Sequence, residues 1–197
     1  MNILFLGDNE KILNFLKFRS SNVIQSQDKI NIDFLLDNNI VFFVSYGYRY
    51  IISEDVVEFF KNKIINLHIS YLPWNRGASP NLWSIIDNTK KGITIHYIDK
   101  KLDTGDIIVQ KELEFDEDIS LRESYNTLRN EIEILFMKNW ILIVNNKLDI
   151  KQQNLSKGTF NTVKATNKLM DKLNIDSWDI SIKEVKNKYK ELKNDNR

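Results

Sequence analysis

The residue types that this chain lacks narrow the chemistry open to it. Its 197 residues include no cysteine, two histidines, two prolines and six glycines. Without cysteine there is no disulfide framework, no thiolate nucleophile and no cysteine-based metal site. Two histidines are also too few for a histidine-rich metal centre, so we expect no metal.

An excess of charge of either sign is missing as well. Lys and Arg number 28 against 27 Asp and Glu, which gives a formal net charge of +1. No overall field therefore attracts the chain to nucleic acid or to an anionic membrane. We expect neither as a partner, and we expect local sites to select the ligands.

Long apolar runs are also absent. No stretch approaches the ~20 apolar residues of a membrane span, and the N-terminus has no basic segment followed by an apolar signal core. The expectation is a cytoplasmic enzyme whose length allows one sizeable core. A homodimer is left open.

Short apolar runs alternate with amphipathic segments, which is typical of α/β folds. Strands are predicted at residues 2–6, 23–25, 40–44, 64–68, 92–99 and 107–115, the last two as a hairpin with a long loop. Helices are predicted around residues 12–16 and 32–36, after Ser53, after Ser79-Pro80, and from Ser120 to Val144. This order predicts a mostly parallel twisted sheet flanked by helices, within a catalytic domain of residues 1–146.

Two side-chain placements follow from these periodicities. In the helix after Ser53, Phe59 is expected on the buried face. In the strand 92–99, Thr94 and His96 are expected on a wetter face, where His96 either lines a site or simply packs.

The last part of the chain is rich in Asn and Lys. A loop is predicted at residues 158–160, a helix near 161–173, and a charged helix beginning at Ser181, which has capping-box spacing to Glu184. We expect residues 147–197 to form a small helical extension on or beside the core.

The strongest chemical signal lies at the end of the strand 64–68. Asn66 and His68 are two residues apart, so an extended backbone points both side chains to one face. A carboxamide can stabilise charge that develops on a carbonyl oxygen, and an imidazole can take a proton from a nucleophile near neutral pH. Together they suggest acyl transfer.

Three ordered blocks carry a family resemblance. They are Asn66-x-His68-x-Ser70-x-Leu72-Pro73, then Gly92-Ile93-Thr94-Ile95-His96, then Leu102-Asp103-Thr104-Gly105-Asp106. The chain resembles the formyltransferases that use 10-formyltetrahydrofolate, and it is most similar to the bacterial enzymes that N-formylate nucleotide-linked amino sugars. The resemblance implies a Rossmann-like formyltransferase fold and 10-formyltetrahydrofolate as co-substrate.

The resemblance also implies roles for individual residues. Asn66, His68 and Asp103 would be catalytic, with Asp103 either orienting the imidazole or relaying a proton. The pterin would contact Tyr46, Gly47, Tyr48, Arg49, Tyr50, Ile98 and Asp99. The acceptor would contact Trp74, Arg76, Gly77, Ser79 and Asn81, with Arg76 as a candidate partner of a diphosphate. Thr104 and Gly105 would shape the Asp103 turn.

The implied reaction is formyl transfer to the primary amine of a dTDP- or UDP-linked amino-dideoxy sugar, for surface polysaccharide or glycan biosynthesis. One alternative is a glycinamide ribonucleotide formyltransferase, although the turn Gly7-Asp8-Asn9-Glu10 has two acids and one glycine, a poor composition for binding phosphate. Methionyl-tRNA formyltransferase is disfavoured because it needs a basic surface. A non-catalytic folate- or nucleotide-binding module is a further alternative.

Overall fold

The computed structural model describes residues 1–195 and divides them into two compact units. Unit 1 comprises Met1–His68, Ile95–Val109 and Ile132–Gln153, and unit 2 comprises Ile69–Thr94, Gln110–Glu131 and Asn154 onward. Three elements contribute residues to both units: β6 (Lys91–Tyr97), β7 (Ile107–Leu113) and α5 (Leu121–Val144). The predicted boundary between residues 146 and 147 stays a prediction.

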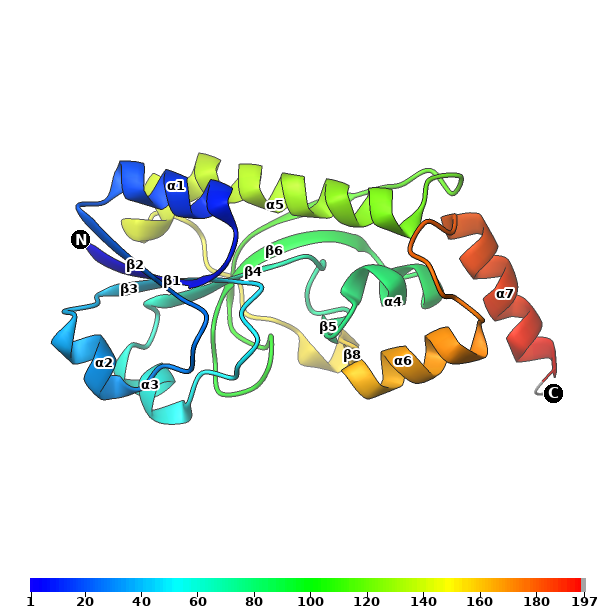
Figure 1. The fold of residues 1–197 in the computed structure, drawn as a ribbon, viewed down its shortest axis with the longest axis horizontal. Coiled ribbons are helices and arrows are strands. Elements are labelled where there is room, and N and C mark those ends of the chain that lie inside the picture. Colours follow the sequence, from blue (N-terminus) through cyan, green and yellow to red (C-terminus); the bar gives the residue numbers. More distant parts are fainter. Residues whose placement is uncertain (196–197) are drawn as a thin grey trace. The chain divides into compact units, whose positions relative to one another are not determined.

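The central sheet has six strands in the order β2-β1-β3-β4-β6-β7 (Figure 1). The first four are β1 (Asn2–Gly7), β2 (Asn22–Ser26), β3 (Phe42–Tyr46) and β4 (Ile64–His68). The pairs β1/β2, β1/β3 and β3/β4 are parallel. The predicted α/β fold with a mostly parallel, helix-flanked sheet is therefore confirmed.

Helices cover both faces of the sheet in unit 1 (Figure 1). On one face lie α1 (Glu10–Arg19) and the C-terminal half of α5, and on the other lie α2 (Ile32–Asp37) and α3 (Glu54–Phe59). Trp140 of α5 packs edge-on against Phe15 of α1 and Phe42 of β3, whereas Phe43 packs against Phe60. Neighbouring strand residues thus serve opposite faces, as a strand requires.

Unit 2 is mainly helical. It contains α4 (Pro80–Ile86), α6 (Val163–Lys172) and α7 (Ile182–Asp195), the 3₁₀ turn η1 (Leu155–Lys157), and the short parallel pair β5 (Arg76–Gly77) and β8 (Phe160–Asn161). Leu82 of α4, Leu121 at the start of α5, Leu169 of α6 and Val185 of α7 belong to one buried cluster. The helical C-terminal segment therefore shares a hydrophobic core with α4.

Several local predictions need correction. The strand predicted at residues 40–44 is β3 at Phe42–Tyr46, because Val41 is exposed and the paired, buried stretch starts at Phe42. In the segment predicted as a loop at residues 158–160, Gly158 and Thr159 form the loop, whereas Phe160 begins β8 and pairs with Arg76. Residues that pair across the chain cannot be recognised from local composition.

Phe59 is also misplaced by the sequence pattern. Its side chain is 60% exposed, while Val56, Val57 and Phe60 are buried. The helix α3 ends at Phe59, so the residue lies where the 3.6-residue periodicity stops applying.

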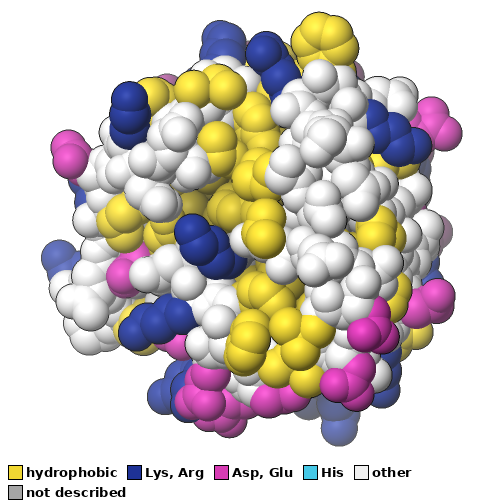
Figure 2. Space-filling model, turned by 90° about the vertical axis from the view of Figure 1, so that its left-hand side faces the viewer, with side chains coloured by type: hydrophobic (Ala, Val, Ile, Leu, Met, Phe, Trp, Pro, Cys, Tyr) yellow, Lys and Arg dark blue, Asp and Glu magenta, His cyan; other side chains and the backbone are white. Residues whose placement is uncertain are grey.

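Figure 2 shows apolar side chains gathered in a band across the face of the molecule that it presents.

Among the helices of residues 1–195, none is both long and apolar enough to cross a lipid bilayer.

Candidate active site

The strand β4 carries two of the predicted catalytic residues at its carboxyl end. In its register with β3, Asn66 lies opposite Ser45, which places the site at the edge where parallel α/β sheets bind ligands. Asn66 and His68 both reach Asp103: Asn66 Nδ2 lies 3.4 Å from Asp103 Oδ1, and His68 Nδ1 lies 3.9 Å from Asp103 Oδ2. The three residues predicted as catalytic therefore meet in unit 1.

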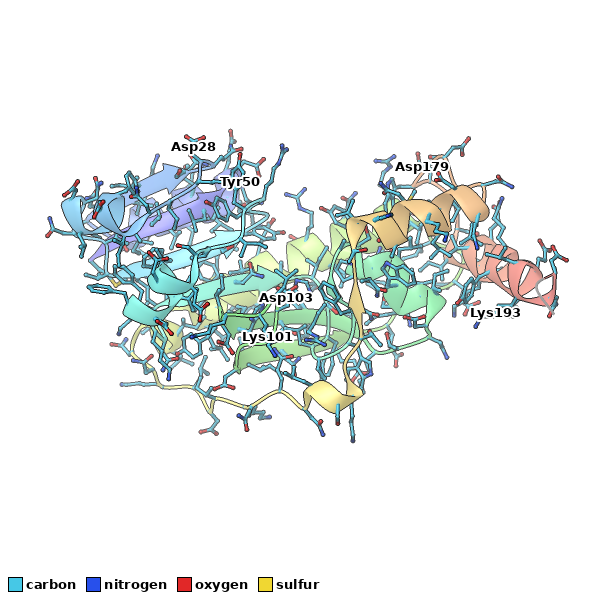
Figure 3. All side chains as sticks on the ribbon, turned by 90° about the horizontal axis from the view of Figure 1, so that it is seen from below. Asp28, Tyr50, Lys101, Asp103, Asp179 and Lys193 are labelled. Carbon is cyan, nitrogen blue, oxygen red and sulfur yellow. The ribbon has the colours of Figure 1, made fainter. Side chains whose placement is uncertain are left out.

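Asp103 is presented by a constrained turn between β6 and β7, on the loop that also carries Lys101 (Figure 3). Its own φ is +54°, a left-handed conformation that is uncommon for a residue with a side chain. The Thr104 hydroxyl donates to Lys101 O at 2.9 Å and closes the turn. A Cβ on Gly105 would lie 1.9 Å from Tyr97 O, so this glycine is needed for close backbone approach. The left-handed backbone angle of this turn is thus at Asp103, while Gly105 permits the close approach to Tyr97.

His68 has one ring nitrogen facing a carboxylate and the other without a partner. Nδ1 faces Asp103, whereas Nε2 is buried and has no hydrogen-bond partner among residues 1–195. A carboxylate beside Nδ1 favours the proton on that nitrogen and leaves the Nε2 lone pair as an acceptor. This arrangement suits a general base.

The site is more enclosed than the sequence suggested. His68 is 8% exposed and Asp103 is 9% exposed, so both side chains are nearly buried. The prediction of a wetter strand face is wrong for the same region, because Thr94 and His96 are 0% and 1% exposed. In a low-dielectric setting, charge–dipole interactions at the site are stronger than in water.

His96 takes part in the site rather than only packing within the strand. Its Nδ1 donates to Tyr97 O at 2.7 Å, and its Nε2 lies 3.3 Å from Asn66 Nδ2 and 3.6 Å from Asp103 Oδ1. Burial lowers the pKa of His96 to about 4, with His68 acting in the same direction and Asp103 opposing it. A neutral imidazole that donates through Nδ1 has a lone pair on Nε2, so it accepts a hydrogen bond from the Asn66 amide.

Sequence reasoning missed one residue of this site. Gln153, which is 8% exposed, donates through Nε2 to Asp103 O at 3.1 Å and to Gly105 O at 2.6 Å. It lies 50 residues from Asp103 in a segment without a recognisable motif. The only sequence signal in this segment was its richness in Asn and Lys, which gave no reason to select this glutamine.

The residues predicted to contact the pterin come from two loops of unit 1. Tyr46 is buried at the end of β3, Gly47 and Arg49 are exposed, and Asp99 accepts a bond from Lys100 N. Tyr48 and Ile98 pack against the same buried cluster. The two loops are therefore supported by one part of the hydrophobic core.

Two of the tyrosines are already engaged within unit 1. The Tyr48 hydroxyl donates to Asp28 O at 2.7 Å, and the Tyr48 and Tyr50 rings are 5.6 Å apart, with Lys29 over Tyr50 (Figure 3 shows Asp28 and Tyr50). A pterin would therefore meet ring faces and backbone groups here, and not the Tyr48 hydroxyl.

The residues predicted to contact the acceptor all lie in unit 2. Arg76 N donates to Thr159 O, and its Nε is buried without a hydrogen-bond partner in the described chain. Trp74 packs near Tyr71 at 6.1 Å, and a Cβ on Gly77 would lie 2.3 Å from Asn161 O. Ser79 occupies the expected N-cap position of α4, but its φ of +50° is left-handed and its side chain makes no capping bond.

Asn81 is the most enclosed of this group at 3% exposure. Its Nδ2 donates to Leu121 O at 3.2 Å and to Ser124 Oγ at 2.9 Å, which ties α4 to the start of α5. In residues 1–195 we find no group of three or more His, Asp or Glu side chains arranged to hold a metal ion.

The fold agrees with comparisons to known proteins. Residues 12–139 match the formyl transferase family, and the chain belongs to that family.

Among solved structures, the chain is similar to the formyltransferase PseJ from Anoxybacillus kamchatkensis, which was crystallised with UDP-4,6-dideoxy-4-formamido-L-AltNAc and tetrahydrofolate. The TM-score is 0.88 at 46% identity, over 96% of this chain and 100% of that one. A 4-N formyltransferase from Francisella tularensis has the same fold, with a TM-score of 0.73 at 24% identity over 94% of this chain and 85% of that one.

A curated relative, the methionyl-tRNA formyltransferase of Clostridium tetani, is 30% identical over 188 residues. That alignment covers 95% of this chain but 57% of the relative, so the chain spans little more than half of its length.

Proposed function

We propose that this protein transfers a formyl group from 10-formyltetrahydrofolate to the primary amine of a nucleotide-linked amino-dideoxy sugar, linked to UDP or dTDP. The observation that carries the proposal is the buried, unpartnered Nε2 of His68 beside Asp103 and Asn66. The likeness to PseJ over the full length of that enzyme supports the choice of a nucleotide sugar.

The residues of unit 1 fit a folate co-substrate. An unpartnered buried acceptor at His68 needs a ligand group, and the loops at Tyr46–Tyr50 and Ile98–Asp99 offer aromatic and backbone surface against one buried cluster. When bound, 10-formyltetrahydrofolate supplies an electrophilic formyl carbon on N10. These loops are proposed to hold its pterin.

His68 is proposed to take a proton from the attacking amine through Nε2. The amine nitrogen forms a bond to the formyl carbon, the bond from that carbon to N10 breaks, and N10 receives a proton. The products are a formamide and tetrahydrofolate. Asp103 holds the imidazole with Nδ1 protonated, which leaves Nε2 ready to accept.

Asn66 is proposed to stabilise the charge that builds up on the formyl oxygen. Its Nδ2 carries two hydrogens, and the acceptors His96 Nε2 and Asp103 Oδ1 are only 3.6 Å apart, so they can share one of them. The other N–H is then available to the formyl oxygen. A single donor of this kind contributes roughly 2.7–4 kcal/mol in other acyl-transfer sites.

A glycinamide ribonucleotide acceptor is less well supported. The Asn9 side chain at the β1–α1 turn accepts from Ile12 N and donates to Glu133 Oε1 at 2.8 Å, which brings a further carboxylate to a turn that already contains Asp8 and Glu10. These carboxylates would repel a phosphate monoester. A methionyl-tRNA acceptor is represented among the relatives, of which the chain spans only part.

The deciding experiment is a turnover assay with 10-formyltetrahydrofolate and a panel of acceptors: UDP- and dTDP-linked amino-dideoxy sugars, the free amino sugar, glycinamide ribonucleotide and methionyl-tRNA. Release of tetrahydrofolate and formation of the formamide are measured together. We expect turnover with a nucleotide sugar and a large loss of kcat/KM when the nucleotide is removed, since its binding energy positions the amine.

Equal efficiency for the free and nucleotide-linked sugars, or robust formylation of glycinamide ribonucleotide, would refute the proposal.

The proposal includes the cytoplasm as the place of reaction and a surface polysaccharide or glycan as the destination of the product. The destination of the product rests on the family resemblance.

A further inference from the structure

The loop of residues 73–78, which follows β4 in the chain, has an unusual backbone. Three of the residues expected to contact the acceptor lie on it: Trp74, Arg76 and Gly77. Asn75 has a φ of +55° and Gly77 a φ of +86°, so two residues of this short loop are left-handed. A left-handed residue with a side chain persists only where surrounding contacts enforce its conformation. The contacts of Asn75 are therefore informative.

These contacts come from a distant segment, residues 158–161. The segment lies after residues 12–139, the part of the chain that matches the formyl transferase family. Within unit 2 its strand β8 pairs in parallel with β5 of the loop (Figure 1). Beside this pair, Arg76 N donates to Thr159 O at 3.0 Å. A segment outside the family match thus supports the backbone of the 73–78 loop.

The Thr159 hydroxyl makes two further bonds, both to Asn75. Asn75 N donates to Thr159 Oγ1 at 2.7 Å, and Thr159 Oγ1 donates to Asn75 Oδ1 at 3.1 Å. The other end of the same carboxamide, Nδ2, donates to Thr89 Oγ1 at 2.7 Å. Asn75 is 0% exposed, so water cannot take the place of these partners. The hydroxyl of Thr159 therefore fixes both the backbone and the side chain of the left-handed residue.

Two glycines allow the segment and the loop to approach closely. A Cβ on Gly158 would lie 2.5 Å from Pro73 O, and a Cβ on Gly77 would lie 2.3 Å from Asn161 O. Asn161 O also accepts from Ala78 N at 2.9 Å. Any larger residue at either glycine would push the segment away from the loop, so the close contact depends on both.

Arg76 carries the group whose direction depends on this contact. Its Nε is buried and has no hydrogen-bond partner in the described chain. A buried donor of this kind is costly until a ligand supplies an acceptor. Because Arg76 follows Asn75 directly, a change in the Asn75 backbone would turn the whole Arg76 side chain.

We propose that Thr159 is a positioning residue for binding of the acceptor. Its hydroxyl keeps Asn75 left-handed and thereby sets the direction of Arg76. The inference rests on the proposed function and adds to it a residue from the C-terminal part of the chain. Thr159 acts through Asn75 and not by contact with a substrate. Loss of its hydroxyl should weaken acceptor binding equally in the ground state and in the transition state, which raises KM and leaves kcat unchanged.

The test is steady-state kinetics of Thr159→Val and Thr159→Ser, with the nucleotide sugar and 10-formyltetrahydrofolate varied in turn. Valine has nearly the shape of threonine but leaves Asn75 N and Oδ1 unpaired. The KM for the nucleotide sugar should therefore rise at least about fivefold, the factor expected for one lost buried hydrogen bond. The KM for the folate and kcat should stay at the wild-type values. Serine keeps the hydroxyl and should restore the wild-type KM.

Thr162→Val is the matched control. Thr162 lies in the same part of the chain, but its hydroxyl caps α6 by accepting from Ala165 N at 3.1 Å. This variant should lower the thermal unfolding midpoint and leave the KM for the nucleotide sugar unchanged. Hydrogen exchange of residues 73–78, measured by mass spectrometry, adds a readout without turnover and should be faster in Thr159→Val than in Thr159→Ser.

Gly158→Ala provides a second variant if Thr159→Val does not fold. Its methyl group would displace the segment from Pro73 O, so it should raise the same KM.

A wild-type KM for the nucleotide sugar in a folded Thr159→Val or Gly158→Ala would overturn the inference and leave the proposed function standing. An equal rise in the KM of both substrates would overturn it too, since that result indicates a general loss of structure. If the wild type formylates no nucleotide sugar, the proposed function fails, and the inference fails with it.

Discussion

The side-chain amide of Gln153 donates to the backbone carbonyl of Asp103 across 3.1 Å. The same nitrogen also holds Gly105 O at 2.6 Å, so one glutamine spans the turn that presents the carboxylate to His68. Asp103 itself has a φ of +54°. A conformation of this kind persists only where surrounding contacts enforce it, and Gln153 provides two of those contacts.

Gln153→Leu should therefore lower kcat more than it changes KM. We expect a loss of roughly tenfold to a hundredfold, because a misplacement of about 1 Å in a catalytic group can cost that much. Gln152→Leu is the matched control, since Gln152 is exposed, and its kcat should remain near the wild-type value. Equal kinetics for both variants would show that the turn holds Asp103 without Gln153.

Asp103→Asn should reduce kcat by about 10²–10⁴-fold, the range typical of general acid–base groups. Asp106→Asn, on the same loop but exposed, should retain most of the activity.

His68→Ala and Asn66→Ala should each lose turnover by orders of magnitude. Steady-state kinetics with folded variants, verified by circular dichroism, decides each case, and a near-normal rate removes that residue from the mechanism.

The buried His96 should make the stability of the fold depend on pH. Its pKa is about 4 in the folded chain and 6.5 when unperturbed, so between these values the unfolded chain binds more protons. The free energy of unfolding should therefore fall as pH decreases from about 6.5 to about 4, by at most about 3 kcal/mol from this residue. In His96→Gln, urea unfolding should show a shallower decline over that window. An unchanged slope would mean that other groups cause it.

Binding of 10-formyltetrahydrofolate should protect backbone amides in two loops from hydrogen exchange. These are the loop at Tyr46–Tyr50 and the loop at residues 98–103, since Tyr48 and Ile98 rest on one cluster. Mass spectrometry of the exchanged chain with and without the folate would measure this. Protection confined to the turn after Gly7 would contradict the placement of the pterin.

Local chemistry in the sequence determined most of the helices and strands, and it determined the pairing of Asn66 with His68. The period of two placed Asn66 and His68 on one face, and the Ser120 and Glu123 capping box forms both of its reciprocal bonds, at 3.1 and 2.8 Å. Such signals depend on neighbours within a few residues, so one chain is enough to recognise them.

Tertiary structure alone decided burial and long-range partnership. It enclosed His68, made His96 a partner of Asn66, exposed Phe59, and brought Gln153 to Asp103 from 50 residues away. It also placed Arg122 and Arg129 beside Asn81 in one cavity. The physical reason is that exposure and hydrogen bonding depend on which segments pack together, and that choice minimises the free energy of the whole chain rather than of any local window.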